Sequence, residues 1–184
     1  MTAFAQVPNR RPWLARWLGL CAALTAAAAA AREPLPTVPH VDLDRYAGTW
    51  HEIARLPNFF QRACIRSQAC YTVLADGGVG VVNTCGTAKG TSRRIEGRAD
   101  PVPGSGNARL RVRFGGLAAL APVSREGNYW IIALDDDYRW ALVGTPDRKF
   151  LWILAREPQL DDEVYSMIVE KARCLGFDVA KLVR

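Results

Sequence analysis

The segment Asp44–Gln61, DRYAGTWHEIARLPNFFQ, is the most informative stretch of this 184-residue sequence. It places the triplet Gly48-Thr49-Trp50 at the start of a run, Trp50–Arg55, that predicts a first β-strand. Two later segments have the same character of a short apolar strand beside a turn. They are LDDDYRWALVG, residues Leu134–Gly144, and FLWILAR, residues Phe150–Arg156. These three segments together decide the fold.

Working outward from them, short apolar runs separated by turn signals fill the chain from residue 50 to residue 156. In Arg109–Phe114, arginines alternate with apolar residues, which predicts one wet and one buried face. Asp76-Gly77-Gly78 signals a hairpin. The predicted strands are Trp50–Arg55, Ala69–Ala75, Val79–Cys85, Arg93–Ala99, Arg109–Phe114, Asn128–Leu134, Tyr138–Val143 and Phe150–Arg156. This spacing indicates an all-β barrel or sandwich. No helical pattern lies between the predicted strands, so a βαβ sheet is not expected.

One helix is predicted near the C-terminus. Its first turn is acidic, at Asp161-Asp162-Glu163, and complements the positive end of a helix dipole. Val164, Ile168 and Leu175 fall on one face, and Gly176 supplies the stop. We expect this helix to pack outside the sheet, followed by a short strand at Phe177–Val183.

The N-terminal residues predict export. Arg10, Arg11 and Arg16 precede an apolar, alanine-rich stretch, Trp17–Ala31, that is short for a spanning helix. We therefore divide the chain into a signal peptide (1–31), an extended proline-containing leader (32–41) and one domain (42–184). The periplasm is the predicted location, with an outer-membrane lipoprotein as the alternative. Sec or twin-arginine export and lipidation of Cys21 stay open.

Charge and cysteine content exclude several classes of function. Without residues 1–31 the net charge falls from +6 to +3, because three arginines are removed, and the remaining basic residues are scattered and do not alternate with aromatic residues in a cluster. Nucleic-acid binding is therefore not expected. An even number of cysteines in the exported part, Cys64, Cys70, Cys85 and Cys174, suggests disulfides, and their spacing does not suit zinc. Three pairings are open from the residues alone.

No cofactor, metal site or catalytic residue is predicted. His51 and Glu52 are adjacent on a strand, so they point to opposite faces and cannot readily pair as acid and base. Asp135-Asp136-Asp137 lacks the pattern of a calcium-binding loop and is interpreted as a solvated turn. The residues themselves therefore give no support for an enzyme.

The extended strings resemble the lipocalin family, in particular the group of bacterial lipocalin and apolipoprotein D. They are Tyr46-x-Gly-Thr-Trp50-x-Glu-Ile-Ala-Arg-Leu-Pro-Asn58, Asp137-Tyr138-Arg139 and Leu151–Arg156, with His51 where relatives usually carry tyrosine. The resemblance implies an eight-stranded antiparallel up-and-down barrel with one C-terminal α-helix packed outside. It gives structural roles to Gly48, Trp50 and Arg156, with Arg156 lying across an indole that plugs the closed end. It also favours a Cys64–Cys85 disulfide, which would leave Cys70 to reach Cys174.

A barrel of this kind holds one small ligand, so the resemblance implies binding, storage or transport of a fatty acid, lysophospholipid or similar lipid. Strand parity predicts a ligand-lining set of Ala54, Tyr71, Val73, Leu110, Val112, Phe114, Tyr129, Ile131, Tyr138 and Trp140. A membrane surface is left open as a second partner, and a monomer or weak dimer is expected. The alternatives are an enzyme with a reactive Cys64 or Cys70 and a protein-interaction module that uses the Phe59-Phe60 loop.

Overall fold

The computed structural model describes residues 33–116 and 122–184. The predicted signal peptide, including Cys21, lies outside the described residues. Leu35–Arg184 form one compact unit. Within the described ranges no helix is long and apolar enough to cross a membrane.

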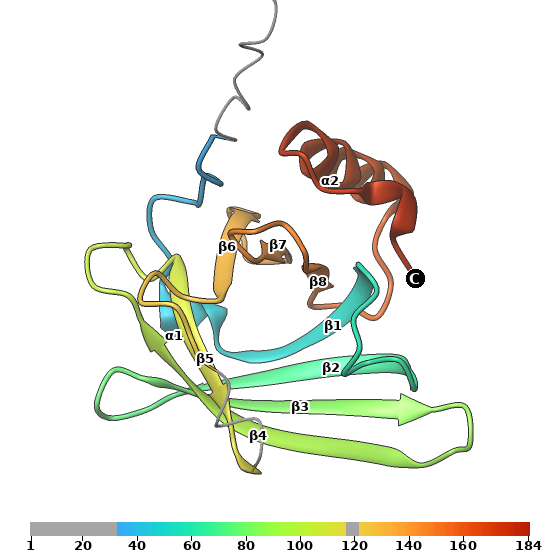
Figure 1. Cartoon of the computed structure of the whole chain (residues 1–184), viewed down its shortest axis with the longest axis horizontal. Helices are drawn as coiled ribbons and strands as arrows, with labels where there is room; N and C mark the ends of the chain where they lie inside the picture. Colours follow the sequence, from blue (N-terminus) through green and yellow to red (C-terminus); the bar gives the residue numbers. More distant parts are fainter. Residues whose placement is uncertain (1–32, 117–121) are drawn as a thin grey trace, which may run out of the picture. The chain divides into compact units, whose positions relative to one another are not determined.

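Eight strands close into one barrel in which each strand is antiparallel to the next and β8 returns to β1 (Figure 1). They are β1 Gly48–Arg55, β2 Cys64–Val73, β3 Val79–Thr87, β4 Ser92–Pro101, β5 Arg109–Phe114, β6 Tyr129–Leu134, β7 Trp140–Gly144 and β8 Leu151–Ala155. The helices are α1 Leu43–Tyr46, α2 Asp162–Cys174 and a short 3₁₀ helix, η3, Val179–Lys181. The predicted eight-stranded up-and-down barrel is confirmed.

The two faces of the strands are buried in different ways. The outer faces of β1 and β6–β8 pack with α2 in one apolar cluster that includes Ile153, Leu142 and the helix residue Ile168. The inner faces form a second cluster around Trp50, with Ile131, Val143 and Leu154 among its members. Neighbours in sequence, such as Ile153 and Leu154, belong to different clusters, as the alternation of side chains along a strand requires.

A β-bulge changes the parity of β1. The register with β8 shifts between Glu52 and Ala54, so that Ala54 pairs with the outward-facing Ile153 and Arg55 pairs with Trp152. Ala54 accordingly packs in the outer cluster. The prediction that Ala54 faces the interior is wrong, because simple alternation does not account for the extra residue that a bulge inserts.

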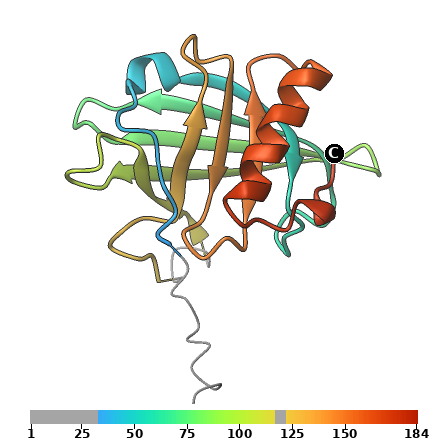
Figure 2. The ribbon, with the colours of Figure 1, turned by 90° about the horizontal axis from the view of Figure 1, so that it is seen from above.

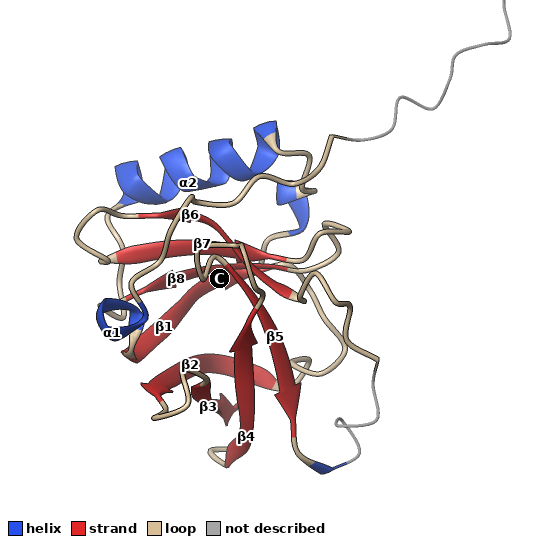
Figure 3. Cartoon of the chain, turned by 90° about the vertical axis from the view of Figure 1, so that its left-hand side faces the viewer, coloured by secondary structure: helices blue, strands red, loops and turns tan. Residues whose placement is uncertain are grey.

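The C-terminal helix packs outside the barrel, over the strands β6–β8, as Figures 2 and 3 show. Asp161 caps it by accepting a hydrogen bond from the Glu163 backbone N–H at 2.9 Å. The predicted strand at Phe177–Val183 is wrong in type, since this segment contains η3. Only Val183 reaches the sheet, through a single antiparallel bridge to Arg55.

Cys64 and Cys85 form a disulfide with their Cα atoms 5.4 Å apart. The predicted Cys70–Cys174 partner bond is wrong, because both cysteines are free and exposed. Cys70 lies on the outer face of β2 between β1 and β3, whereas Cys174 ends α2, which packs elsewhere on the barrel (Figures 1 and 3). The alternative pairing of Cys70 with Cys85 is not formed either, because the β2–β3 hairpin places Cys70 opposite Val82.

Candidate ligand-binding interior

The interior face of the barrel carries most of the residues that parity selected. Cross-strand pairing aligns Tyr71 with Val81, Val73 with Val79, Val112 with Ala99 and Phe114 with Gly97 on this face. Leu110, Tyr129 and Ile131 belong to or pack against the same inner cluster. The structure thus brings Tyr71, Val73, Leu110, Val112, Phe114, Tyr129 and Ile131 together around one volume. Their contact with a ligand remains a prediction.

Several interior residues are only partly buried. Ala69, Val112, Phe114, Tyr129 and Trp152 pack against the inner cluster, yet each retains intermediate exposure. The outer cluster likewise combines fully buried members with partly buried ones. The partly buried residues of the inner cluster face the barrel interior, so solvent can reach part of this wall.

Trp140 and Tyr138 are placed differently from the prediction. Trp140 pairs with Ala155 and packs in the outer cluster against α2, so its assignment to the interior is wrong. Tyr138 lies in the β6–β7 turn with φ 60°, and its hydroxyl accepts a hydrogen bond from the Asp42 N–H at 2.9 Å. Tyr138 therefore lies beyond the strands at the closed end, although its side chain still packs against the inner cluster. Its contact with a ligand stays a prediction. The β6–β7 turn extends to residue 139, so β7 begins at Trp140 and not at Tyr138. Alternation counted from a strand that starts at Tyr138 therefore predicts the wrong face for Trp140.

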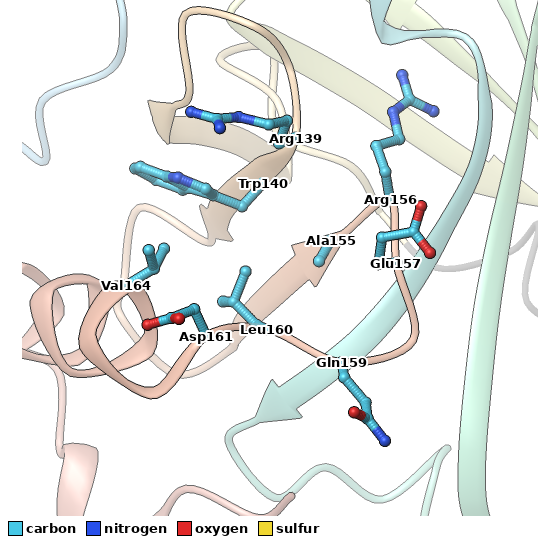
Figure 4. A pocket seen from close by; sticks show the side chains of 9 residues that line it. All are labelled: Arg139, Trp140, Ala155, Arg156, Glu157, Gln159, Leu160, Asp161 and Val164. Carbon is cyan, nitrogen blue, oxygen red and sulfur yellow. The ribbon is translucent and has the colours of Figure 1, made fainter.

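Trp140 instead borders a pocket of about 340 Å³ outside the barrel (Figure 4). Leu160 and Val164 form its apolar side, and Arg139 and Arg156 lie at its edge. Arg139 already makes a two-pronged ion pair with Asp135, at 2.8 and 2.9 Å. Arg156 donates to three backbone carbonyls, as described next, so both cations at the edge of the pocket already have partners in the protein.

The closed end of the barrel is built around Trp50. Its side chain is fully buried, and its indole N–H donates to the Tyr46 carbonyl at 2.8 Å. The Arg156 guanidinium carbon lies 4.0 Å from the centre of the indole ring. Arg156 also donates to the carbonyls of Arg45, Thr49 and Tyr138, at 2.6, 3.0 and 3.2 Å. The predicted stacking of Arg156 on Trp50 is thus present in the structure.

Gly48 makes this closure sterically feasible. Its φ of +92° is a conformation that side-chain-bearing residues rarely adopt. A Cβ added there would lie 3.3 Å from Nη1 of Arg156. Gly48 therefore permits both the turn into β1 and the close approach of the guanidinium group.

Three tyrosine hydroxyls meet on the inner side of the closed end. The Tyr129 hydroxyl lies 2.8 Å from that of Tyr46 and 3.0 Å from that of Tyr71. Burial raises the pKa of Tyr71 to about 12 and the pKa values of Tyr46 and Tyr129 well above their usual 10. All three groups are therefore neutral hydroxyls at physiological pH.

Toward the open end, the interior wall carries an ion pair. The bulge turns Arg55 inward, where its guanidinium group meets the Glu52 carboxylate at 2.6 Å, with side-chain exposures of 12% and 7%. Arg55 also donates to the carbonyls of Gln61 and Cys64, at 3.3 and 3.0 Å. The Gln61 side chain donates to Glu52 at 2.6 Å and accepts from the Trp152 indole at 3.0 Å. This network ties the β1–β2 loop to the wall and leaves the pair electrically balanced.

The rim of the open end is aromatic. Phe59 and Phe60 in the β1–β2 loop are 72% and 51% exposed. Phe60 lies 5.6 Å from Phe150 and 6.5 Å from Trp152, measured between ring centres. The rim therefore continues an apolar path from the surface to the interior wall.

One polar atom of the described interior is left unpaired. Asn83 on β3 aligns with Ala69 and Ile95, on the inward-facing parity of Val81. Its side-chain oxygen is buried and has no hydrogen-bond partner. Within the described ranges, no group of three or more His, Cys, Asp or Glu residues could hold a metal ion.

A closed antiparallel barrel with a plugged end, an accessible apolar wall and an external helix defines the class of ligand-enclosing β-barrels. A family model for the lipocalin-like domain matches residues 41–184, and the chain belongs to the lipocalin family. It is 39% identical to the outer membrane lipoprotein Blc of Escherichia coli, over 91% of this chain and 96% of the relative. It is 37% identical to temperature-induced lipocalin-1 of Arabidopsis thaliana, over 82% of each chain.

Mouse apolipoprotein D is 31% identical over 80% of this chain and 77% of its own length. Among solved structures, insecticyanin of the tobacco hornworm Manduca sexta has a TM-score of 0.59 at 22% identity and covers 81% of this chain and 82% of its own. The predicted membership in the group of bacterial lipocalin and apolipoprotein D is confirmed, and the solved structure supports the fold alone.

Sequence reasoning missed the Glu52–Arg55 pair and the cluster that Tyr46 forms with the predicted interior residues Tyr71 and Tyr129. The Glu52–Arg55 pair depends on the β-bulge between Glu52 and Ala54 in β1, and the sequence of this strand gives no clear sign of a bulge. The tyrosine cluster draws on α1, β2 and β6, which are far apart in sequence. Tyr46 was placed only within the family string, although its position four residues before Trp50 could have indicated a role at the same end.

Proposed function

We propose that this protein is an exported carrier that holds one small apolar or lipid-like ligand inside its barrel. The observation that carries the proposal is the partly exposed interior wall, apolar over most of its height and closed at one end by Trp50 and Arg156. The name of the Escherichia coli relative, an outer membrane lipoprotein, supports a place in the cell envelope. We propose the periplasm or the outer membrane as the location, following a signal peptide at residues 1–31.

The proposed role is binding and not catalysis. Cys64, one of the two candidate nucleophiles, is consumed in a disulfide. Cys70 lies on the outer face of β2 and points away from the interior. Neither thiol can therefore act on a molecule held in the barrel.

Binding is tested by titrating delipidated protein with a fluorescent fatty acid. We expect saturable binding of one equivalent. Val112→Trp adds bulk to the interior wall and should weaken binding at least tenfold, whereas Arg113→Trp, on the exposed side of the same strand, should not. If the wild-type protein binds no fatty acid, lysolipid or apolar dye, the proposal is wrong.

We further propose that the ligand is exchanged at an anionic membrane surface that contacts the open end. Exposed basic residues surround the aromatic rim, among them Arg62, Arg66, Lys89 and Arg93, and none of these has an acidic partner in the described ranges. Basic charge beside exposed aromatic residues suits the headgroup region of a bilayer that contains anionic lipid.

Vesicle flotation tests this docking. The protein should bind vesicles with 30% anionic phospholipid, a mixture chosen for the test, more strongly than vesicles of zwitterionic lipid alone. Phe59→Ser/Phe60→Ser should lose most of this binding, and Met167→Ser, which removes an exposed apolar residue of α2, should retain it. Equal binding by both variants would rule out the open end as the membrane contact.

A further inference from the structure

The tyrosine cluster at the closed end contains more hydrogen-bond donors than it can use. Tyr46, Tyr71 and Tyr129 contribute three hydroxyl hydrogens, and the two contacts that join them, at 2.8 and 3.0 Å, consume two. Whichever way the hydroxyls rotate, one hydrogen has no acceptor within the cluster. A buried donor without an acceptor destabilises the protein.

Tyr129 is the group that can direct this extra hydrogen into the barrel. It is the shared member of both contacts, and its oxygen has two lone pairs that can accept from Tyr46 and Tyr71 together. Tyr46 and Tyr71 are 2% and 7% exposed, whereas Tyr129 retains intermediate exposure. When both neighbours donate to Tyr129, its own hydrogen is the one left over, on the least covered residue of the three.

The surroundings favour a neutral acceptor over an anion. The inner cluster around the hydroxyls is apolar, with Ile131, Leu110 and Val143 among its members. Arg156 at the closed end stacks on Trp50 and already donates to three backbone carbonyls. An ionised carboxylate would have to shed its water for one donated hydrogen bond, which costs far more than burial of a carbonyl.

We propose that the Tyr129 hydroxyl anchors a neutral carbonyl oxygen at the end of the ligand that enters the barrel first. The ligand class is then a chain or ring that is apolar along its length and carries a ketone, aldehyde or ester group at its deep end. This assignment rests on the proposed carrier function and narrows it.

The test compares two probes in competition with a bound apolar dye: a straight-chain methyl ketone and the hydrocarbon of the same carbon number. Desolvation of each probe is the same for every variant, so the ratio of the two affinities isolates the contact made by the oxygen. Tyr129→Phe should shift this ratio against the ketone by about fivefold, the effect of one net hydrogen bond. Tyr165→Phe is the matched control, because it removes the hydroxyl of a tyrosine on α2, outside the barrel, and its ratio should equal that of the wild type.

A second variant, Tyr46→Phe/Tyr71→Phe/Tyr129→Phe, removes all three hydroxyls and keeps the rings, and it should show a shift at least as large. An unchanged ratio in Tyr129→Phe overturns the assignment. The assignment is also overturned if the wild-type protein binds the fatty acid of equal length more tightly than the ketone and Tyr129→Phe abolishes that preference. If the wild-type protein binds neither probe, the carrier function fails instead, which is a different result from binding with an unaltered ratio.

Discussion

The closed end and the open end of the barrel are built from different side-chain interactions. At the closed end, buried Trp50 is covered by Arg156, whose donors are taken up by three backbone carbonyls. At the open end, the loop that follows β1 is held by the Glu52–Arg55 pair and the Cys64–Cys85 disulfide, and it exposes Phe59 and Phe60.

Charge follows the same division. At the closed end aspartates are paired with arginines, as in Arg139–Asp135 and Arg98–Asp76, whereas four exposed basic residues of the open end have no acidic partner in the described ranges: Arg62, Arg66, Lys89 and Arg93. The difference teaches that one end is organised for permanent closure and the other for contact. The following changes test that contrast, in order of decreasing effect on stability.

Glu52→Ala should be the most damaging single change at the open end. It leaves the Arg55 guanidinium group, 12% exposed, without its carboxylate, and it removes an acceptor of Gln61. Loss of one partner of a buried pair predicts a fall of about 4 kcal/mol in the free energy of unfolding. Urea denaturation measures it. Glu52→Leu/Arg55→Met, which removes both charges, should recover much of the loss; if it does not, the pair is not the origin of the effect.

The tyrosines make the closed end sensitive to alkali. Burial, the largest influence, raises the pKa of Tyr71 from its usual 10 to about 12. Below pH 10 both the folded and the unfolded chain keep this proton, so the contribution to stability is fully present. Between pH 10 and 12 the unfolded chain ionises first, so up to about 3 kcal/mol is lost as pH rises through the folded pKa.

Melting temperatures measured from pH 8 to pH 12 check this expectation. Tyr71→Phe should flatten the decline above pH 10, because phenylalanine has no proton to lose. A decline of the same steepness in wild type and variant would contradict the assigned burial of Tyr71.

Arg156→Ala should cost about 2 kcal/mol, the scale of a desolvated cation–π contact. The variant loses the stacking on Trp50 and leaves the carbonyls of Arg45 and Thr49 without a donor. Arg139→Ala is the control, since Arg139 is an exposed arginine of the neighbouring turn. A melting midpoint in Arg156→Ala equal to that of the control would remove the proposed role of the pairing.

The closed end could be anticipated from the sequence because its parts are carried by continuous strings. Gly48 and Trp50 are adjacent in one motif, and Arg156 ends another, so the family resemblance was sufficient to bring them together. The regular alternation in Arg109–Phe114 likewise identified the inner face of β5 without knowledge of the other strands.

The open end could not be anticipated in the same way. One inserted residue in β1 reverses the faces of Ala54 and Arg55, and strand alternation offers no sign of it. The assignment of Trp140 to the interior is wrong for a related reason: the preceding turn is longer than assumed, and the side chain faces α2. The resemblance that favours Cys64–Cys85 leaves Cys70 to reach Cys174, but the two elements that carry these cysteines pack in different places, and both thiols are free.

The smallest predicted effect concerns the wall between the two ends. The buried side-chain oxygen of Asn83 has no partner, so Asn83→Val should raise the free energy of unfolding by about 1 kcal/mol. Asn128 is the matched control, because its side chain accepts from the Val112 N–H at 2.7 Å and donates to the Val112 carbonyl at 3.0 Å. Asn128→Val should therefore destabilise the protein. If the two variants change stability in the same direction, the oxygen of Asn83 is paired in solution, and the wall between the two ends is better satisfied than its contacts indicate.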